Sequence, residues 1–526
     1  MSDVFPLYIL MILIIALLIV LAGRIKVAYP ILLVLAGLGI SFFNGIPKIH
    51  IEPRTIFVIF LPPLLYVAAW TISSKELWRW RRIIGSFAFG VVFFTALSVA
   101  LVANSLIPGF TLALGFLLGG IVSPPDGVSV TEIVKFVKIP KRMSSVLEGE
   151  SLLNDTASLI IFRFALIAVA TGQFIWWKAV LNFGWVVITG IIAGLVVGWI
   201  FIQMHKRLSS DTNVDVVLTI IAPYLMYLSG EFIHGSGVIA VIAGGLLLSN
   251  KRYMFLKSGT RLRGADVWES LLFVLNGAIF MLLGLDLPQI ISALRSESIT
   301  LSTAIGYSLV IAVVLILSRI IFSFLSVFIT LAASRFIKVA DDRNPGYKTP
   351  LIFGWTGMRG VASLAAALSI PLQMNGGASF PHRSLILFIT FVVILFTLLL
   401  QGLTLPYLIK RLKPSDYADH LSENEAEVLI SRGFEKSAHE YLSGNFGEGN
   451  GVSSELHKLV ENWIEENPED KHERIQPVVK KKYLELLNKQ RNWLLDENRS
   501  NINLDEEIVR KFLLRIDMEE ARVNLE

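Results

Sequence analysis

The stretch Glu148-Gly149-Glu150-Ser151-Leu152-Leu153-Asn154-Asp155 opens an apolar run that reaches to about Thr171. A helix of this length can cross a bilayer, because about 20 apolar residues span the hydrocarbon core. The run nevertheless carries a carboxylate, Asp155, roughly one turn inside its start. An ionised group in hydrocarbon is costly, so such residues usually face a protein interior or a wet cavity and mark ion pathways. The sequence therefore predicts an ion site on this helix.

Oxygen-bearing side chains repeat at helical spacing around this carboxylate. Ser151 and Asp155 are four residues apart, which places a hydroxyl and a carboxylate on one helix face. Glu150 and Asn154 form a second such pair on the neighbouring stripe. Oxygen ligands that are partly dehydrated suit a proton or a hard cation such as Na⁺. The alternative is a cluster that only caps the start of the helix, which is strongest for Glu148 because it precedes the apolar run.

Composition places the chain in the membrane. Of its 526 residues 54% are hydrophobic and 17% are charged, whereas soluble domains carry about a quarter charged residues. The apolar runs are continuous rather than alternating, so the spanning elements are expected to be helices. The first run begins at about Phe5 with no basic segment before it, and we expect it to be a retained helix. Cysteine is absent, which excludes disulfides, thiolate chemistry and cysteine-ligated metals.

The apolar runs predict an all-α polytopic protein with about thirteen transmembrane helices. Lys and Arg crowd alternate loops, so the positive-inside rule puts the N-terminus outside and the C-terminus in the cytoplasm. The expected location is the cell (inner) membrane, and the basic excess is topological, with no nucleic-acid partner. Residues 1–412 form the predicted transmembrane domain, and residues 413–526 a charged, largely helical cytoplasmic tail.

Two predicted spans contain helix breakers. The fifth reads Gly119-Gly120-Ile121-Val122-Ser123-Pro124-Pro125-Asp126-Gly127, and the twelfth reads Gly354-Trp355-Thr356-Gly357-Met358-Arg359-Gly360. Proline removes an amide donor and glycine permits unusual dihedral angles, so both helices should be interrupted. Paired interruptions seven spans apart run in opposite directions, as the inverted repeats of transporters require. Asp126 would then neutralise half-helix N-termini and Arg359 half-helix C-termini; the alternative is ordinary proline kinks and glycine packing faces.

Two further arginines lie within apolar runs. Arg319, deep in the eleventh span, needs an acidic partner or a wet lumen, and Glu150 is the candidate partner. Arg163 lies eight residues beyond Asp155 on roughly the same helix face. It either tunes the field at the site or extends outward to the interface.

Together these residues resemble the cation:proton antiporter-1 family, the sodium/proton exchangers of bacteria, plants and animals. The resemblance covers about four-fifths of the chain. It is carried by residues 149–155 and by four further motifs, which are Leu61-Pro62-Pro63-Leu64-Leu65, His234-Gly235-Ser236-Gly237-Val238, Gly357-Met358-Arg359-Gly360-Val361 and Gln401-Gly402-Leu403-Thr404-Leu405-Pro406.

The resemblance implies a homodimer in which a six-helix core moves against a dimerisation domain, with crossed broken helices near the ion. It further implies that Asp155 carries Na⁺ and H⁺ in turn, with Ser151 as a Na⁺ ligand and Asn154 beside it. Asp126 would lie at the crossover, and Glu150 with Arg319 would form a supporting ion pair. Such a protein is not an enzyme and needs no cofactor, since Na⁺ and H⁺ are its transported substrates.

The chain departs from the family pattern at two places. Pro125-Asp126-Gly127 replaces the common Thr-Asp-Pro, so a threonine ligand is missing. Tyr66-Val67 follows the paired prolines of the third span where many relatives carry a glutamate. The site therefore offers fewer anionic oxygens than in some relatives.

We predict a secondary active antiporter that exchanges Na⁺, or Li⁺, for H⁺ and serves pH and sodium homeostasis. A single membrane carboxylate predicts electroneutral exchange. The alternatives are a K⁺/H⁺ antiporter and a cation channel. The matched helix interruptions favour an antiporter over a channel.

Overall fold

The computed structural model describes residues 5–25, 29–42, 53–127, 130, 137, 139–172, 176–208, 211–297, 299–333, 346–374, 379–414, 421–445 and 476–525. The chain divides into two compact units. Unit 1 comprises Met1–Met204, Leu218–Arg252 and Trp268–Asp416, and unit 2 comprises His205–Val217, Tyr253–Val267 and Tyr417–Glu526.

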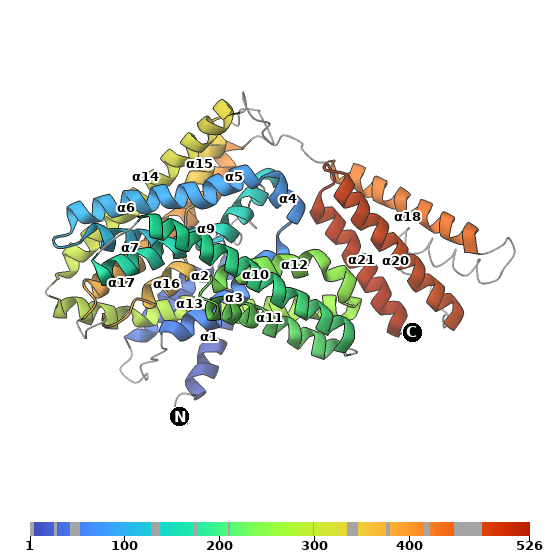
Figure 1. The fold of residues 1–526 in the computed structure, drawn as a ribbon, viewed down its shortest axis with the longest axis horizontal. Coiled ribbons are helices and arrows are strands. Elements are labelled where there is room, and N and C mark those ends of the chain that lie inside the picture. The colour runs from blue at the N-terminus through green and yellow to red at the C-terminus, as the bar shows by residue number, and fades with distance from the viewer. Residues whose placement is uncertain are drawn as a thin grey trace. The chain divides into compact units, whose positions relative to one another are not determined.

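The described part of unit 1 is built of helices joined by short non-helical segments (Figure 1). Its elements are α1 (Phe5–Ile25), α2 (Tyr29–Ser41), α3 (Pro53–Thr71), α4 (Ser74–Arg79), α5 (Arg81–Gly85), the wider-turned η1 (Ser86–Val91), α6 (Val92–Leu106), α7 (Leu112–Val122), α9 (Lys141–Thr171), α14 (Leu301–Ala333), α15 (Lys348–Trp355), α16 (Val361–Leu368) and α17 (Arg383–Leu412), together with most of α10 (Trp176–Leu208), α11 (Thr212–Phe232), α12 (Gly237–Phe255) and α13 (Ser258–Ser296). Among the described residues β-structure is limited to one isolated bridge, between Gln373 and Ser379.

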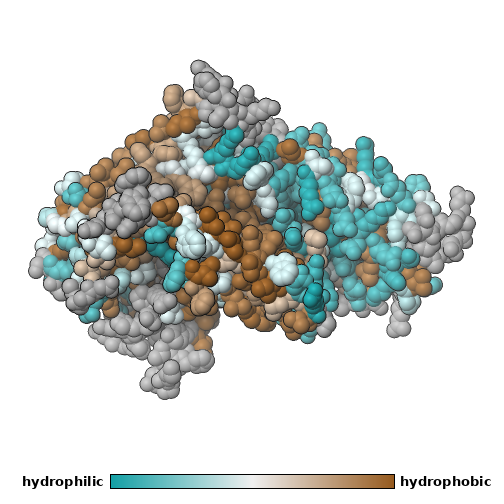
Figure 2. Space-filling model, in the orientation of Figure 1, coloured by the Kyte–Doolittle hydropathy of each residue, from teal (hydrophilic) through white to brown (hydrophobic). Residues whose placement is uncertain are grey.

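The helices have the length and surface of membrane spans. Eight of those described are long and apolar enough to cross a bilayer, and four shorter helices are also apolar. Large apolar side chains recur along one exposed face of α10, at Leu181, Trp185, Ile188 and Trp199. Figure 2 shows broad apolar areas on the surface of unit 1. The predicted class, an all-α polytopic membrane protein, is confirmed, while the count of thirteen spans stays a prediction.

Unit 1 contains two sets of helices. In the first, which we call the site bundle, α7 packs against α6 and α9, and α14 packs against α6, α15 and α17. This bundle also includes α4, α5, η1 and α16. In the second, the flanking bundle (α1–α3 and α10–α13), Ser249 of α12 donates a hydrogen bond to the Trp70 carbonyl of α3, at 2.8 Å. The two bundles touch where α3 meets α9 and α16, and where α2 meets α17.

Helix interruptions occur where the sequence predicts them. After α7 ends at Val122, residues 124–126 are not helical, and the following part of the fifth span, residues 128–134, lies mostly outside the described residues. Residues 356–360 separate α15 from α16. The prolines cannot donate the amide hydrogen bonds that α7 would need to continue, and the glycines of the second break relieve its crowded backbone.

Unit 2 has its own apolar core. It is formed by α18 (Glu423–Asn445), α20 (Pro477–Ser500) and α21 (Glu506–Leu525), whose inward faces include Phe434, Tyr483 and Phe512. Buried Asp517 of α21 accepts hydrogen bonds from Arg491 at 3.0 Å and from Arg261 at 2.5 Å. A buried carboxylate requires such partners, because an unpaired charge in a protein interior is costly.

Candidate ion-binding site

The two interrupted helices meet at their breaks. The Asp126 N–H donates a hydrogen bond to the Met358 carbonyl at 2.6 Å, so the two non-helical segments are joined backbone to backbone. The approach leaves no room for side chains. A Cβ added at Gly360 would collide with the Asp126 carboxylate, and one added at Gly127 would collide with the Ser151 hydroxyl. Glycine is therefore required at both places, and Asp126 and Ser151 lie close to one another.

Arg359 binds the carbonyl groups that the breaks leave without helical partners. Its side chain is fully buried, and its Nε donates to the Val122 carbonyl at 2.8 Å. Nη2 donates to the Ser123 carbonyl at 3.3 Å, and Nη1 to the Gly357 carbonyl. The end of a helix carries a partial negative charge on such carbonyls. The guanidinium therefore stabilises the end of α7 and its own break together.

A second buried arginine pairs with a carboxylate. Arg319 Nη1 lies 2.6 Å from Glu150 Oε1 and Nη2 lies 2.9 Å from Oε2, and both side chains are 1% exposed. Arg319 Nε also donates to the Phe353 carbonyl at 3.1 Å. A guanidinium matches a carboxylate through two parallel hydrogen bonds, which fixes both side chains in position. This pair joins α9 to α14 and, through Phe353, to α15.

The remaining site residues of α9 lie beside the first break. Asn154 is fully buried, and its Nδ2 donates to the Pro125 carbonyl at 3.1 Å. Its Oδ1 is buried and has no hydrogen-bond partner among the described residues. Asp155 is half-buried, one helical turn beyond Ser151. An unpaired amide oxygen and a carboxylate on adjacent positions are groups that a hard cation or a proton can use.

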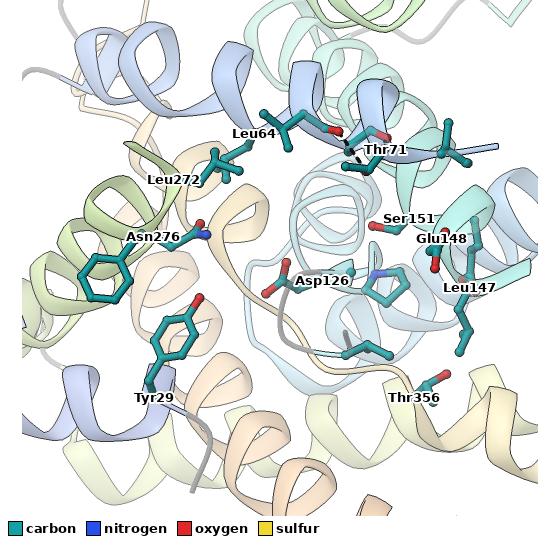
Figure 3. Close-up of a pocket in the computed structure, with 18 of the residues that line it drawn as sticks. Tyr29, Leu64, Thr71, Asp126, Leu147, Glu148, Ser151, Leu272, Asn276 and Thr356 are labelled. Atoms are coloured by element: carbon teal, nitrogen blue, oxygen red, sulfur yellow. Dashed lines mark hydrogen bonds between the residues drawn. The ribbon is translucent and has the colours of Figure 1, made fainter. Parts of the chain in front are cut away.

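A cavity of about 520 Å³ reaches this site. Figure 3 shows that its lining includes Asp126 from the first break, Ser151 of α9 and Asn276 of α13. Asp155 is not among the lining residues, so the cavity ends about one helical turn before it. The described residues contain no cluster of three or more acidic, His or Cys groups that could hold a metal.

The cavity is reached from one end. Its lining residues Thr71, Glu148 and Glu269 are exposed, whereas Asn276 is only 5% exposed. Carboxylates at an opening raise the local concentration of cations. The exposed end of the cavity, where α9 begins, therefore carries groups that attract cations.

Several cavity residues were not expected from the sequence. Asn276 is polar within an apolar run and has a buried Oδ1 without a partner among the described residues. A polar residue within an apolar run could have been recognised from the sequence as a candidate for the cavity lining. Thr356 lies within the second break, and Tyr29 begins α2. Thr356 belongs to the helix-breaking stretch of the twelfth span but was not singled out there, and Tyr29 belongs to no motif, so only the packing of the bundles brings it to the cavity.

Two crossed helix interruptions, with charged groups at the helix ends and carboxylates beside a cavity, define an ion-translocating membrane transporter of the inverted-repeat class. The sequence model of the family described as "Sodium/hydrogen exchanger, transmembrane" matches residues 9–411, and the chain belongs to this family. The family predicted from the sequence is thereby confirmed. It is a family of transporters, not of enzymes, and the ions that its members move are substrates and not cofactors.

Individual proteins similar to this chain are also named as cation/proton antiporters or exchangers. A sodium, potassium, lithium and rubidium/H⁺ antiporter of Bacillus subtilis is 34% identical over 388 residues, which cover 72% of this chain and 58% of that protein. A Mycobacterium tuberculosis protein, named as an uncharacterized Na⁺/H⁺ exchanger, is 30% identical over 521 residues, 96% of this chain and 93% of its own length. The solved structure of the sodium proton antiporter MjNhaP1 from Methanocaldococcus jannaschii has a TM-score of 0.60 at 20% identity. It covers 78% of this chain and 99% of its own, which establishes the shared fold.

Proposed function

We propose that this protein is a secondary antiporter that exchanges Na⁺ for H⁺ across the cell membrane. The observation that carries the proposal is the crossing of the two helix breaks, where the Asp126 N–H is hydrogen-bonded to the Met358 carbonyl. Ser151 and Asn154 of α9 lie beside this crossing. Asp155 follows one turn further along α9. Family membership supports ion exchange at this site. Sodium is common to the names of the three proteins compared above, which makes Na⁺ the first candidate ion.

Asp155 is the proposed exchanging carboxylate. It must lose its proton before it can bind Na⁺, so the two ions compete for one group. Ser151 is the proposed second Na⁺ ligand, with Asn154 and Asp126 nearby. One titrating carboxylate predicts exchange of one Na⁺ for one H⁺, without net charge movement. Such exchange would serve pH and sodium homeostasis.

The other charged residues have supporting roles in this proposal. Glu150 and Arg319 neutralise each other, so that neither adds a net charge at the site. Arg359 donates hydrogen bonds to the carbonyl groups that lack helical partners at the break of α7. With Glu150 neutralised by Arg319, Asp155 is the carboxylate that the proposal assigns to exchange.

The proposed topology follows the loop charges. The N-terminus lies outside and the C-terminus inside, and residues 413–526 form a cytoplasmic tail after the membrane domain of residues 1–412. The exposed end of the cavity is close in sequence to the basic residues Arg79, Arg81 and Arg82, and to Lys141. By the positive-inside rule this end faces the cytoplasm. The proposed assembly is a homodimer, as the family resemblance implies.

Proton-coupled flux in proteoliposomes tests the proposal. The full chain is reconstituted with a pH gradient, the membrane potential is clamped, and Na⁺, Li⁺ and K⁺ are added separately. We expect Na⁺ to dissipate the pH gradient and an outward Na⁺ gradient to drive protons inward against their own gradient. Cation flux without coupled proton movement would indicate a channel instead. Activity with K⁺ but not with Na⁺ would reassign the substrate.

A further inference from the structure

An ion pair joins the two bundles of unit 1 near the far end of α9. Arg163 Nη2 lies 2.5 Å from Glu231 Oε1 at the end of α11. Arg163 Nη1 also donates to the Gly235 carbonyl, at 3.4 Å, in the turn between α11 and α12. The guanidinium of a site-bundle helix is thus bonded twice to the flanking bundle.

The turn that receives Arg163 is fixed within the flanking bundle. The Gly235 N–H donates to the Gly230 carbonyl at 2.9 Å, and the Ser236 N–H to the Val186 carbonyl of α10 at 3.2 Å. The Glu231 carboxylate accepts a further hydrogen bond from the Gly237 N–H at 3.1 Å, at the start of α12. These hydrogen bonds hold Glu231 against α11 and α12 independently of its contact with Arg163.

Arg163, by contrast, is carried by the site bundle. Its neighbour Phe162 is buried, and α9 approaches α7 so closely that a Cβ at Gly120 would lie 2.9 Å from the Phe162 nitrogen. A rigid movement of the site bundle against the flanking bundle would therefore change the Arg163–Glu231 distance directly.

The ion pair and the cavity lie on opposite sides of Asp155 along α9. The residues of α9 that line the cavity are Leu147, Glu148, Glu150 and Ser151, all before Asp155. Arg163 comes eight residues after it, which is about 12 Å at the rise of an α-helix. The cavity gives access to the site from one side, while the ion pair holds the two bundles together on the other.

We propose that Arg163 and Glu231 form a latch that closes the side of the transporter opposite the cavity. The latch is formed in the conformation described here and opens when the site becomes accessible from that side. This inference rests on the proposed exchange function, because it assumes that access to Asp155 alternates. Arg163 and Glu231 are positioning residues in this cycle and do not bind the transported ion.

The exposure of the pair suits a contact that must open repeatedly. The side chains of Arg163 and Glu231 are 42% and 33% exposed, so water screens their attraction. Ion pairs of this exposure change an equilibrium by about 1.5- to 5-fold. A buried pair such as Arg319–Glu150 would be far too costly to separate in each cycle. The weak pair is at the boundary between the bundles, and the strong pair is inside one of them.

Single-cysteine accessibility tests the latch, because the chain has no cysteine of its own. Leu159, half-buried and midway between Asp155 and Arg163 on α9, reports on the latch side. Leu272, in the cavity lining, reports on the cavity side. Leu159→Cys and Leu272→Cys are made separately in the full chain. Each is labelled in proteoliposomes with a membrane-impermeant maleimide applied from its own side.

We expect Arg163→Gln and Glu231→Gln each to raise the labelling rate at Leu159→Cys by about two- to fivefold. The rate at Leu272→Cys should fall, since the two sides open alternately. Glu231→Gln keeps an acceptor for the Gly237 N–H and removes only the charge. The exchanged pair Arg163→Glu with Glu231→Arg restores the ion pair but not the acceptor for the Gly237 N–H, so both labelling rates should return part of the way toward those of the single-cysteine protein without latch substitutions.

Three results would overturn the latch, and a fourth would overturn only the proposed exchange function. A general loosening of the structure would raise both labelling rates and would overturn the latch, as would unchanged rates in the two Gln variants. Arg79→Gln is the matched control, because it removes an ion pair with Glu76 inside a single helix, at 3.8 Å. An equal shift in this control would also overturn the proposal. If wild-type protein shows no exchange but the two rates still move in opposite directions, the proposed function fails and the latch stands.

Discussion

Arg319 and Glu150 are bound to each other by two hydrogen bonds, of 2.6 and 2.9 Å, and both side chains are buried within the site bundle. Two charges of opposite sign therefore cancel between α9 and α14. Ser151 follows Glu150 directly and is the last residue of α9 that lines the cavity. The ion pair thus holds α9 against α14 directly beside the proposed exchange site.

Removal of the Arg319 side chain should leave the Glu150 carboxylate buried without its ion-pair partner. We expect Arg319→Ala to lower the free energy of unfolding by about 3–5 kcal/mol, because an unpaired charge remains buried. Arg319→Met combined with Glu150→Leu should recover part of this loss, although not necessarily exchange. Thermal unfolding of the purified variants measures both effects. If the double variant is as unstable as the sum of the two single variants, the pair does not stabilise the bundle in this way.

The glycine at the crossing should not tolerate a methyl group. Gly360→Ala would force its Cβ into the Asp126 carboxylate, so the two breaks would have to separate. We expect exchange to fall at least tenfold and the unfolding temperature to decrease. Gly306→Ala on α14 is the matched control, since nothing lies within 4 Å of a Cβ there. That change should leave exchange intact and stabilise the helix by up to about 1 kcal/mol. Normal exchange in Gly360→Ala would show that the crossing is not needed.

Local sequence was sufficient to predict the positions of the helix breaks. Prolines 124 and 125 and the glycines around Arg359 act on the backbone of their own segment, so no distant contact is needed to find them. Arg319 was predicted to need an acidic partner or a wet lumen, with Glu150 as the candidate partner, and the two side chains are paired. The functional roles of Asp155, Ser151 and Asn154 remain predictions.

Contacts between distant helices could not be predicted in the same way. The sequence left two possibilities for Arg163, and its partner Glu231 lies 68 residues away at the end of another helix. Asn276 reaches the cavity only because α13 packs opposite the first break. Such contacts depend on how the two bundles pack against each other, and neither the hydrophobic periodicity nor the charge pattern of the sequence determines that packing.

The first turn of α18 in unit 2 should be sensitive to acid. Glu425 accepts hydrogen bonds from the Ser422 hydroxyl at 2.8 Å and the Ser422 N–H at 3.0 Å, and these lower the pKa of Glu425 below its ordinary value. A lowered folded-state pKa means that this cap stabilises the helix at neutral pH. The stabilisation is lost as the pH falls through the lowered pKa.

Hydrogen exchange of the first turn of α18, measured in the full chain from pH 7 downward, checks this cap. Amide protection, corrected for the intrinsic pH dependence of exchange, should hold through mildly acidic pH and then fall. Ser422→Ala removes the hydroxyl, so its protection should already be lower and should fall at a higher pH. Identical profiles for the two proteins would contradict the assignment of the cap.

Asp155→Asn tests the centre of the proposed mechanism. The amide keeps the shape of the side chain but removes its negative charge and its exchangeable proton. Exchange should be lost for Na⁺, Li⁺ and K⁺ alike, measured as cation-driven proton flux in proteoliposomes. Protein yield and thermal stability should be largely retained, because a neutral amide is easier to bury than a carboxylate. The loss would therefore be one of chemistry and not of folding.

Competition between the two ions provides the companion measurement in the wild-type protein. If Asp155 binds either H⁺ or Na⁺, lowering the pH must raise the Na⁺ concentration needed for half-maximal flux, and added Na⁺ must release protons from the purified protein. Asp155→Glu keeps the acid but moves it by one methylene, so weak exchange with a shifted pH profile is expected. Asp155→Asn should release no protons on addition of Na⁺. Full cation-driven proton flux in Asp155→Asn would mean that another group carries the exchange, and Asp126, the other carboxylate at the crossing, would be the next to replace.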